Sequence, residues 1–327
     1  MPGLAYSSRS TPAARASSLT GSGSVDFGSP ALLALGELLR KNDYAFTTVT
    51  PATQVLVMRR ALPAQTLRDV FGWTLAFNPT RFAAVAGLLR AAGAALPAQG
   101  DDIRSAVRFA TVGSRLFVHS GFPTLGQASV FFGPDTYRFA RAIANLCAQR
   151  PLGRVVDIGA GSGAGGILAA PSASAIVLAD INPTALDAAR TNLALNHLEA
   201  SLVVSDVLAG VDGPIDTVLA NPPFMADRLG RAYRDGGGPL GTDLAVRIVE
   251  QSLQRLQPGG RLLLYSGAPI VAGRDRLAEA LGALPRRGVR EWRYEEIDPD
   301  IFGEELSEPA YAEVERIAAV QLTVTVA

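Results

Sequence analysis

The stretch Val155–Gly166 reads VVDIGAGSGAGG, and it decides the fold of this chain. A short apolar run ends in Asp157, closely spaced glycines follow, and an Ala-rich apolar segment comes next. This order predicts a buried strand, a tight glycine turn and the start of a helix. Glycine allows positive φ and close approach of the backbone to a ligand. The free N–H groups at the helix N-terminus then form a seat for a nucleotide-like ligand.

The alternation of strands and helices continues after this stretch. Short apolar runs predict five strands, at residues 154–158, 175–179, 201–204, 216–220 and 261–265. Helices are expected at residues 183–196, where Asn182 caps and Pro183 begins the helix, and at 240–256. Two late strands, at 289–297 and 317–326, have no predicted helix between them. We expect an α/β fold with a Rossmann-like, doubly wound, mostly parallel sheet that ends in an antiparallel hairpin.

The segment before this sheet predicts a smaller α+β domain. Residues 1–29 are rich in Ser, Ala, Gly and Thr, which favours a disordered tail, with a transit peptide as the alternative. Helices are expected from Pro30, near residues 63–73, and over 80–96 with Thr80 as the cap, followed by a hairpin that turns at Gly113-Ser114. We therefore divide the chain into a tail (1–29), a helical and hairpin substrate-recognition domain (30–125) and a catalytic domain (126–327).

Composition limits the classes of function. Hydrophobic residues make up 48% and charged residues 18%, which permits a large core. Lys+Arg and Asp+Glu are equal at 30 each, which argues against a large nucleic-acid footprint. The single cysteine, Cys147, excludes an internal disulfide, and the two histidines offer no zinc spacing, so no metal site is expected. No apolar run reaches the ~20 residues of a membrane span, and we expect a soluble, cytoplasmic protein.

Polar residues stand at the ends of the next three predicted strands. They are Asp180 in VLADIN, Asp206 in VVSDVL, and Asn221-Pro222-Pro223-Phe224 in VLANPPF. The glycines alone also satisfy the dinucleotide spacing G-x-G-x-x-G, which leaves an NAD-binding oxidoreductase as a rival hypothesis. Asn-Pro-Pro-Phe after the fourth strand argues against that rival.

With these motifs the sequence resembles the class I S-adenosylmethionine (SAM) methyltransferases of the (D/N)PP(Y/F) amino-methyltransferase group. Within that group it is similar to the release-factor glutamine methyltransferases and to the ribosomal RNA guanine-N2 methyltransferases. Pro134-Asp135-Thr136 matches the PDT of a motif in the release-factor enzymes, whereas Gly133 and Tyr137 depart from it. A helix cap is the structural alternative for Asp135 and Thr136.

The resemblance implies SAM as cofactor and a role for each motif. Asp157 would reach the ammonium group, the glycine turn would lie against the methionyl part, and Asp180 would take the ribose hydroxyls. Asp206 would accept from the adenine amino group while the Val207 N–H faces the ring. The expected cofactor-binding residues are Asp157, Gly159, Gly161, Gly163, Asp180, Ile181, Asp206, Val207 and Asn221.

The NPPF stretch is the predicted catalytic element, formed by Asn221, Pro222, Pro223 and Phe224. The Asn221 amide oxygen and the Pro222 carbonyl can each accept one N–H of a planar NH2, which aims the nitrogen lone pair at the methyl donor. The prolines hold the loop extended, and Phe224 offers a flat face for stacking on a base or an amide. A plain Pro-Pro turn is the structural alternative.

These motifs predict a SAM-dependent N-methyltransferase. The first choice of acceptor is a glutamine side chain of a protein such as a translation factor, and the alternatives are guanine N2 or adenine N6 of RNA or DNA, or a small molecule. A catalytically silent SAM-binding partner is the hypothesis from another class. Two polar surfaces have either a substrate-facing or a plain structural interpretation: the loop Tyr233–Gly238, and the arginines of the N-terminal domain, which are Arg59, Arg60, Arg68, Arg81 and Arg90.

Overall fold

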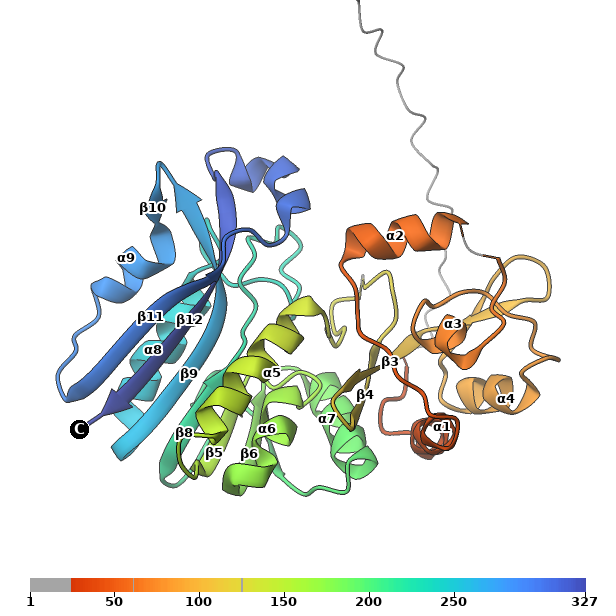
Figure 1. Cartoon of the computed structure of the whole chain (residues 1–327), viewed down its shortest axis with the longest axis horizontal. Helices are drawn as coiled ribbons and strands as arrows, with labels where there is room; N and C mark the ends of the chain where they lie inside the picture. Colours follow the sequence, from red (N-terminus) through yellow and green to blue (C-terminus); the bar gives the residue numbers. More distant parts are fainter. Residues whose placement is uncertain (1–24, 61, 125) are drawn as a thin grey trace, which may run out of the picture.

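The structure is a computed structural model that describes residues 25–60, 62–124 and 126–327. Its centre is one large sheet in the order β11-β12-β9-β8-β5-β6-β7, with the short β10 paired to β9 (Figure 1). The strands are β5 (Gly153–Ile158), β6 (Ala173–Asp180), β7 (Ser201–Val204), β8 (Ile215–Ala220), β9 (Leu256–Val271), β10 (Arg274–Asp275), β11 (Val289–Asp298) and β12 (Arg316–Val326). Strands β9, β8, β5, β6 and β7 are parallel to one another. Strand β12 pairs antiparallel with β9 on one side and with β11 on the other. The predicted fold class and its closing antiparallel hairpin are confirmed.

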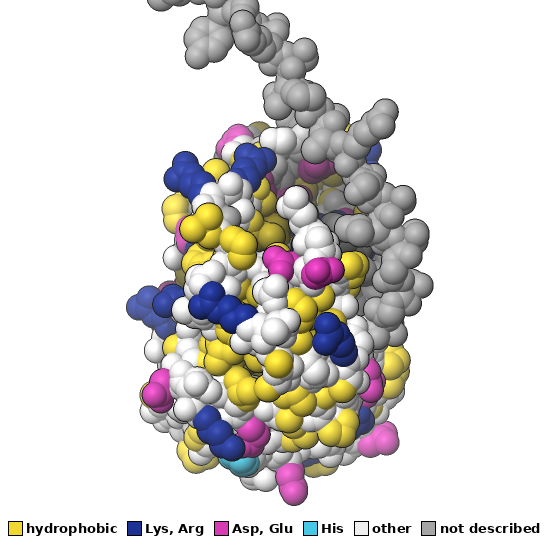
Figure 2. All heavy atoms as spheres, turned by 90° about the vertical axis from the view of Figure 1, so that its right-hand side faces the viewer, with side chains coloured by type: hydrophobic (Ala, Val, Ile, Leu, Met, Phe, Trp, Pro, Cys, Tyr) yellow, Lys and Arg dark blue, Asp and Glu magenta, His cyan; other side chains and the backbone are white. Residues whose placement is uncertain are grey.

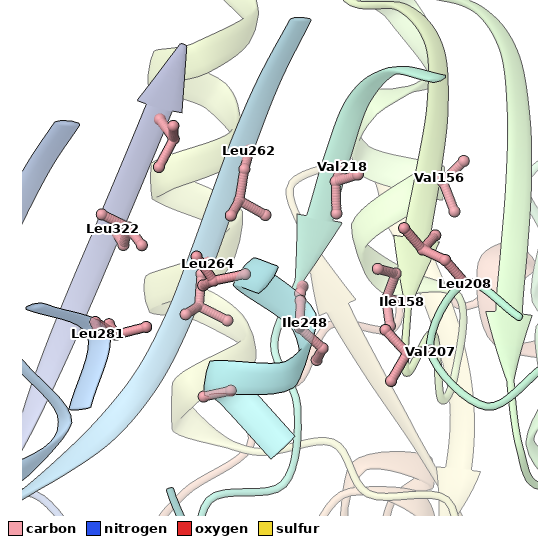
Figure 3. Close-up of a cluster of buried hydrophobic side chains, with 14 of the residues drawn as sticks. Val156, Ile158, Val207, Leu208, Val218, Ile248, Leu262, Leu264, Leu281 and Leu322 are labelled. Carbon is pink, nitrogen blue, oxygen red and sulfur yellow. The ribbon is translucent and has the colours of Figure 1, made fainter. Parts of the chain in front are cut away.

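Helices cover both faces of this sheet. They are α5 (Pro134–Cys147), α6 (Ala164–Ala169), α7 (Pro183–Leu195), α8 (Asp243–Arg255) and α9 (Arg276–Gly282). Neighbouring strand residues point to opposite faces. Val156, Val218 and Leu262 pack under α8 and α9, and Figure 3 shows this cluster with Ile248 and Leu281. Val155, Leu219 and Leu263 pack under α5 on the other face.

The described residues before α5 form four helices and two small two-stranded sheets. Their bounds are α1 (Pro30–Lys41), α2 (Pro51–Arg60), α3 (Leu67–Phe71), α4 (Ala83–Ala91), β1 (Ala95–Pro97), β2 (Ile103–Ser105), β3 (Val107–Val112) and β4 (Arg115–Ser120). Two asparagines of α7 bind the edge of β4. The Val118 N–H donates to Asn192 Oδ1 at 2.7 Å, and the Leu116 N–H donates to Asn196 Oδ1 at 3.1 Å. These bonds and a shared apolar core attach the N-terminal part to the catalytic part.

Several expected boundaries are wrong. Residues 1–24 of the predicted tail lie outside the described residues, but Phe27 is buried at 4% exposure and Ser29 caps α1, so ordered structure begins before residue 29. The helix expected over 80–96 begins only at Ala83, because the N–H of Thr80 instead donates to Asn78 Oδ1 in a turn. The helix expected near 63–73 is the short α3, which starts at a capping box of Thr66 and Asp69.

Two helices were not predicted. Helix α2 buries only Gln54 and so has no apolar face that the sequence pattern could reveal. Helix α9 lies between β10 and β11, where no helix was expected, and it packs Leu277 and Leu281 onto the sheet. None of the described helices is long and apolar enough to cross a membrane.

Candidate active site

A cavity of about 430 Å³ lies at the carboxyl ends of β5, β6 and β8. Strand β5 pairs with β6 on one side and with β8 on the other, so the connections after β5 and β8 diverge at this point. Such a switch point is where open α/β sheets bind ligands. Its size falls in the range of small-molecule sites, about 300–1,000 Å³. Every residue predicted for the cofactor or for catalysis lines this cavity except Gly163.

The glycine turn presents bare backbone to the cavity. Gly159 and Gly161 have φ values of 63° and 53°, which favour glycine. A Cβ built on either residue would meet no atom closer than 4.0 Å at Gly159 and 3.9 Å at Gly161, so a side chain would grow into the open space. This is the space that the methionyl part of SAM requires, and the turn therefore fits that cofactor.

The later glycines serve packing instead. Gly163 is absent from the cavity wall, and a Cβ there would lie 3.0 Å from Leu178 and 3.2 Å from Ala189. Gly163 therefore lets α6 approach β6 and α7, and its contact with the cofactor stays a prediction. Gly165 covers the carboxylate of Asp157, since a Cβ there would lie 2.7 Å from both carboxylate oxygens.

Asp157 is a buried acid beneath the glycine turn. It is 2% exposed, and its Oδ2 accepts a hydrogen bond from the Gly166 N–H at 2.8 Å. Burial raises the pKa of Asp157 to about 7, the Gly166 bond opposes that rise, and the nearby Asp180 carboxylate adds to it. The carboxylate thus anchors the start of α6 while it also borders the cavity.

Asp180 ends β6 and connects two loops. Its Oδ2 accepts from the Gly161 N–H and its Oδ1 from the Asn182 N–H, both at 2.8 Å. Burial raises the pKa of Asp180, and these backbone bonds oppose the rise. The next residue, Ile181, is 58% exposed and lines the cavity, which leaves an apolar surface for a flat ring.

Asp206 follows β7 and forms an ion pair with Arg247 of α8. Both residues line the cavity, and both side chains are about half exposed. Val207 has a φ of 53°, a conformation that is costly for a β-branched residue and that is kept mainly where surrounding structure demands it. Sequence reasoning missed Arg247, because only the packing of α8 brings it to the loop after β7.

Asn221 and Pro222 follow the end of β8 and lie beside the glycine turn that follows β5. Asn221 is half-buried, and its side-chain amide has no hydrogen-bond partner within the described part of the chain. A Cβ at Gly159 would lie 4.0 Å from Pro222 Cα, so the two loops are adjacent. An amide acceptor therefore borders the same space as the bare backbone.

Phe224 is more buried than its predicted stacking role suggests. It is 8% exposed, and its ring packs against Tyr265 and Phe302 at centroid distances of 6.4 and 5.9 Å. Gly267 of β9 lies directly against the ring, and a Cβ there would clash with it. Phe224 thus forms a wall of the cavity and fixes the loop on the core.

The loop after Phe224 closes one side of the cavity and is held by several contacts. Arg231 binds both carboxylate oxygens of Asp227, and these bonds lower the pKa of Asp227. The Tyr233 hydroxyl donates to the Thr124 carbonyl at 2.7 Å, which joins this loop to the segment before α5. Of the predicted loop residues, Tyr233, Arg234 and Asp235 line the cavity.

The structure adds to the cavity an aromatic pair, Phe131 and Tyr233, and a buried acid, Asp135. Phe131 is 36% exposed, and its ring is nearly parallel to that of Tyr233, with an interplanar angle of 14° and centroids 6.4 Å apart. Asp135 is 2% exposed and accepts a hydrogen bond from the Tyr265 hydroxyl. Gly133 is the N-cap of α5, and the Thr136 hydroxyl accepts from its N–H, so of the two expected capping residues Thr136 takes part in the cap and Asp135 does not.

Comparison with known proteins shows which families this part of the chain is similar to. Residues 139–284 match the family of the methyltransferase small domain. A release factor glutamine methyltransferase of Deinococcus radiodurans is 34% identical over 170 residues, 46% of this chain and 55% of the relative. A ribosomal RNA small subunit methyltransferase C of Haemophilus influenzae is 33% identical over 163 residues, 47% of this chain and 45% of the relative.

The chain spans about half the length of the curated relatives that it matches. A solved 16S rRNA N2 methyltransferase of T. thermophilus, in complex with AdoMet and guanosine, is 17% identical and has a TM-score of 0.45, over 77% of this chain and 64% of that one. Within the described residues no group of His, Cys, Asp or Glu could hold a metal ion. The part of this chain that matches the methyltransferase small domain family, residues 139–284, therefore includes both the glycine turn and the Asn221–Phe224 loop of the cavity.

Proposed function

We propose that this chain is a SAM-dependent N-methyltransferase that acts on a planar NH2 group. The observation that carries the proposal is the Asn221 amide, which borders the cavity next to the bare glycine turn and has no partner among the described residues. SAM, when bound, supplies a methyl group on a positively charged sulfur. The residues of the chain need only bind and orient the two reactants.

The orientation comes from acceptors on a rigid loop. Asn221 Oδ1 and the Pro222 carbonyl each accept a hydrogen bond from one N–H of the substrate NH2 group. The lone pair of that nitrogen then points away from both oxygens. Pro222 and Pro223 restrict the backbone, and the packing of Phe224 against Gly267 fixes the end of the loop. The two carbonyl oxygens are therefore in position before the substrate binds. Such preorganised groups stabilise the transition state without any rearrangement of the protein.

Two classes of acceptor fit this chemistry. A protein glutamine side chain is supported by the likeness to release factor glutamine methyltransferases and by Pro134-Asp135-Thr136. A nucleic-acid base is supported by the likeness to a ribosomal RNA methyltransferase and by the parallel rings of Phe131 and Tyr233 at the cavity, which suit a flat acceptor.

Incubation of the protein with labelled SAM and cell extract tests the proposal. Labelled product should form, and treatment with protease or with nuclease should show which class of macromolecule carries it. Calorimetric titration is the companion measurement, in which SAM and S-adenosylhomocysteine bind and NAD does not. Binding of NAD without binding of SAM would contradict the proposal.

A further inference from the structure

Charge is divided unevenly between the two parts of the chain. Residues 25–124 carry ten Lys and Arg against six Asp and Glu, a net charge of +4. Residues 126–327 carry eighteen Lys and Arg against twenty-four Asp and Glu, a net charge of −6. The overall neutrality of the sequence therefore hides a basic N-terminal part beside an acidic catalytic part.

Within residues 25–60 and 62–124, no Lys or Arg side chain forms an ion pair with an acidic side chain. All eleven ion pairs of the described residues join side chains between Asp135 and Arg316. A solvated protein surface commonly mixes charges of both signs, which neutralise one another locally. Positive side chains without acidic neighbours instead produce a positive electrostatic potential, which attracts a polyanion.

Half of these cations lie on helices α2 to α4 and the turn before α4. We call them the basic face, which consists of Arg59, Arg60, Arg68, Arg81 and Arg90. All five are exposed, and the one acid in this segment, Asp69, uses its carboxylate to accept from the backbone N–H groups of Gln65 and Thr66. Figure 2 looks onto this end of the molecule and shows Lys and Arg side chains spread among exposed apolar ones, with some Asp and Glu side chains between them.

The basic face also offers flat and apolar surface. The guanidinium groups of Arg68 and Arg81 lie over the rings of Phe46 and Phe82, at 5.8 and 5.7 Å from the ring centroids. Leu56 of α2 is 52% exposed and Leu62 is 80% exposed. Arginine planes and apolar side chains are the surfaces on which unpaired bases stack.

The position of α2 relates the basic face to the cavity. In Figure 1, α2 lies on the same upper side of the molecule as the loops that follow β8 and line the cavity. On the cavity side, the segment between β4 and α5 binds the loop after β8, because Thr124 accepts from Tyr233 and Gln127 donates to the Leu229 carbonyl at 3.0 Å. A chain bound across the basic face can therefore reach the aromatic pair of Phe131 and Tyr233.

We propose that the basic face binds the sugar–phosphate backbone of a single-stranded nucleic acid, one base of which enters the cavity. This inference rests on the proposed function and names its substrate class. Asn221 is half-buried in the cavity wall, so a target base must be unstacked to reach it, and unstacking costs least when the strand is already single. The phosphates of the backbone would neutralise the net positive charge of the N-terminal part.

Fluorescence anisotropy with the full-length protein tests this binding. The probes are a labelled 20-nucleotide RNA and a DNA of the same sequence, titrated between 50 and 200 mM KCl with S-adenosylhomocysteine present. The test variant is Arg59→Ser with Arg60→Ser. The matched control is Arg287→Ser with Arg290→Ser, which removes the same charge at the far end of the sheet, where both side chains are exposed.

The wild type and the control should bind with the same salt dependence. The test variant should lose about 1.4 from the slope of log affinity against log salt, at about 0.7 for each single-strand phosphate contact. Over this salt range the wild type then loses about sevenfold more affinity than the variant does. Tighter binding of RNA than of DNA, or the reverse, identifies the natural strand.

Two results would overturn the inference. One is the absence of binding at 50 mM KCl, and the other is an equal loss of affinity in the test and control variants. The affinity for S-adenosylhomocysteine and the labelling of extract proteins, measured on the same samples, report on the proposed function separately. If protein labelling persists in the Arg59→Ser, Arg60→Ser variant and no nucleic acid binds, the methyltransferase stands and its acceptor is a protein.

Discussion

The carboxylate of Asp180 accepts a hydrogen bond from the backbone N–H of Gly161 at 2.8 Å, which ties the end of β6 to the glycine turn after β5. A second oxygen of the same carboxylate accepts from the Asn182 N–H. The acid that was predicted to hold a ribose thus also shapes the turn that was predicted to hold the methionyl part. Its loss should affect both halves of the cofactor site.

Asp180→Ala should weaken SAM binding by about 10- to 100-fold, because a hydrogen bond to a charged group contributes about 1.5–3 kcal/mol. Asp206→Ala is the matched comparison, since Asp206 is exposed and already paired with Arg247, and its loss should cost about tenfold or less. Calorimetry on both variants measures these affinities. Equal effects of the two substitutions would contradict the anchoring role of Asp180.

Asn221→Ala should lower the rate of methyl transfer by about 10²–10³, because it removes one preorganised acceptor from the NH2. SAM affinity should change little, since the glycine turn and Asp180 remain. Asn221→Asp should keep substantial activity, because a carboxylate still accepts the N–H. Single-turnover transfer, measured beside SAM affinity, distinguishes these outcomes, and a wild-type rate for Asn221→Ala would make the loop purely structural.

Gly267→Ala should impair transfer more than SAM binding. The added methyl group would clash with the Phe224 ring and so displace the end of the Asn221–Phe224 loop. Phe224→Ala should lower the free energy of unfolding by about 3–5 kcal/mol in addition to any rise in acceptor KM, because the ring is buried. Chemical denaturation and steady-state kinetics measure the two effects. Gly282→Ala is the control, since a Cβ there meets no neighbour.

Asp157 should make stability depend on pH. Its folded pKa of about 7 is far above the ordinary value, so the native state holds a proton that the unfolded state releases at lower pH. The free energy of unfolding should therefore fall as the pH rises from about 4 to 7 and then level off. Asp157→Asn should remove this slope, and denaturant unfolding at a series of pH values measures it. A slope that persists unchanged in the variant would assign it to other groups.

Removal of residues 1–28 should destabilise the protein more than removal of residues 1–24. Phe27 is buried, and its carbonyl accepts a hydrogen bond from the Thr191 hydroxyl of α7 at 2.6 Å. Phe27→Ala in the full chain should cost about 3 kcal/mol by itself. Thermal melts of the two shortened chains and the point variant test this. Equal melting temperatures would place the start of the folded part at residue 29, as the sequence predicted.

The sequence by itself determined the parts of the site that lie next to one another along the chain. The apolar run before Asp157, the glycines after it and the polar residues after β6, β7 and β8 are local patterns, because strand ends and tight turns depend on nearby residues. A parallel sheet then brings the carboxyl ends of its strands to one edge, so the predicted residues meet at one cavity. For this reason the fold could be predicted, and so could the edge of the sheet at which the predicted residues meet.

Only the tertiary structure decided which distant side chains complete the site. Arg247 reaches Asp206 because α8 packs on the sheet. Phe224 is buried because Gly267 of β9, which has no side chain, lies directly against its ring. The packing role of Gly163 was not visible in the sequence for the same reason, since its neighbours Leu178 and Ala189 come from other elements. The physical cause is that such contacts depend on how whole elements pack, and no local periodicity in the sequence records that packing.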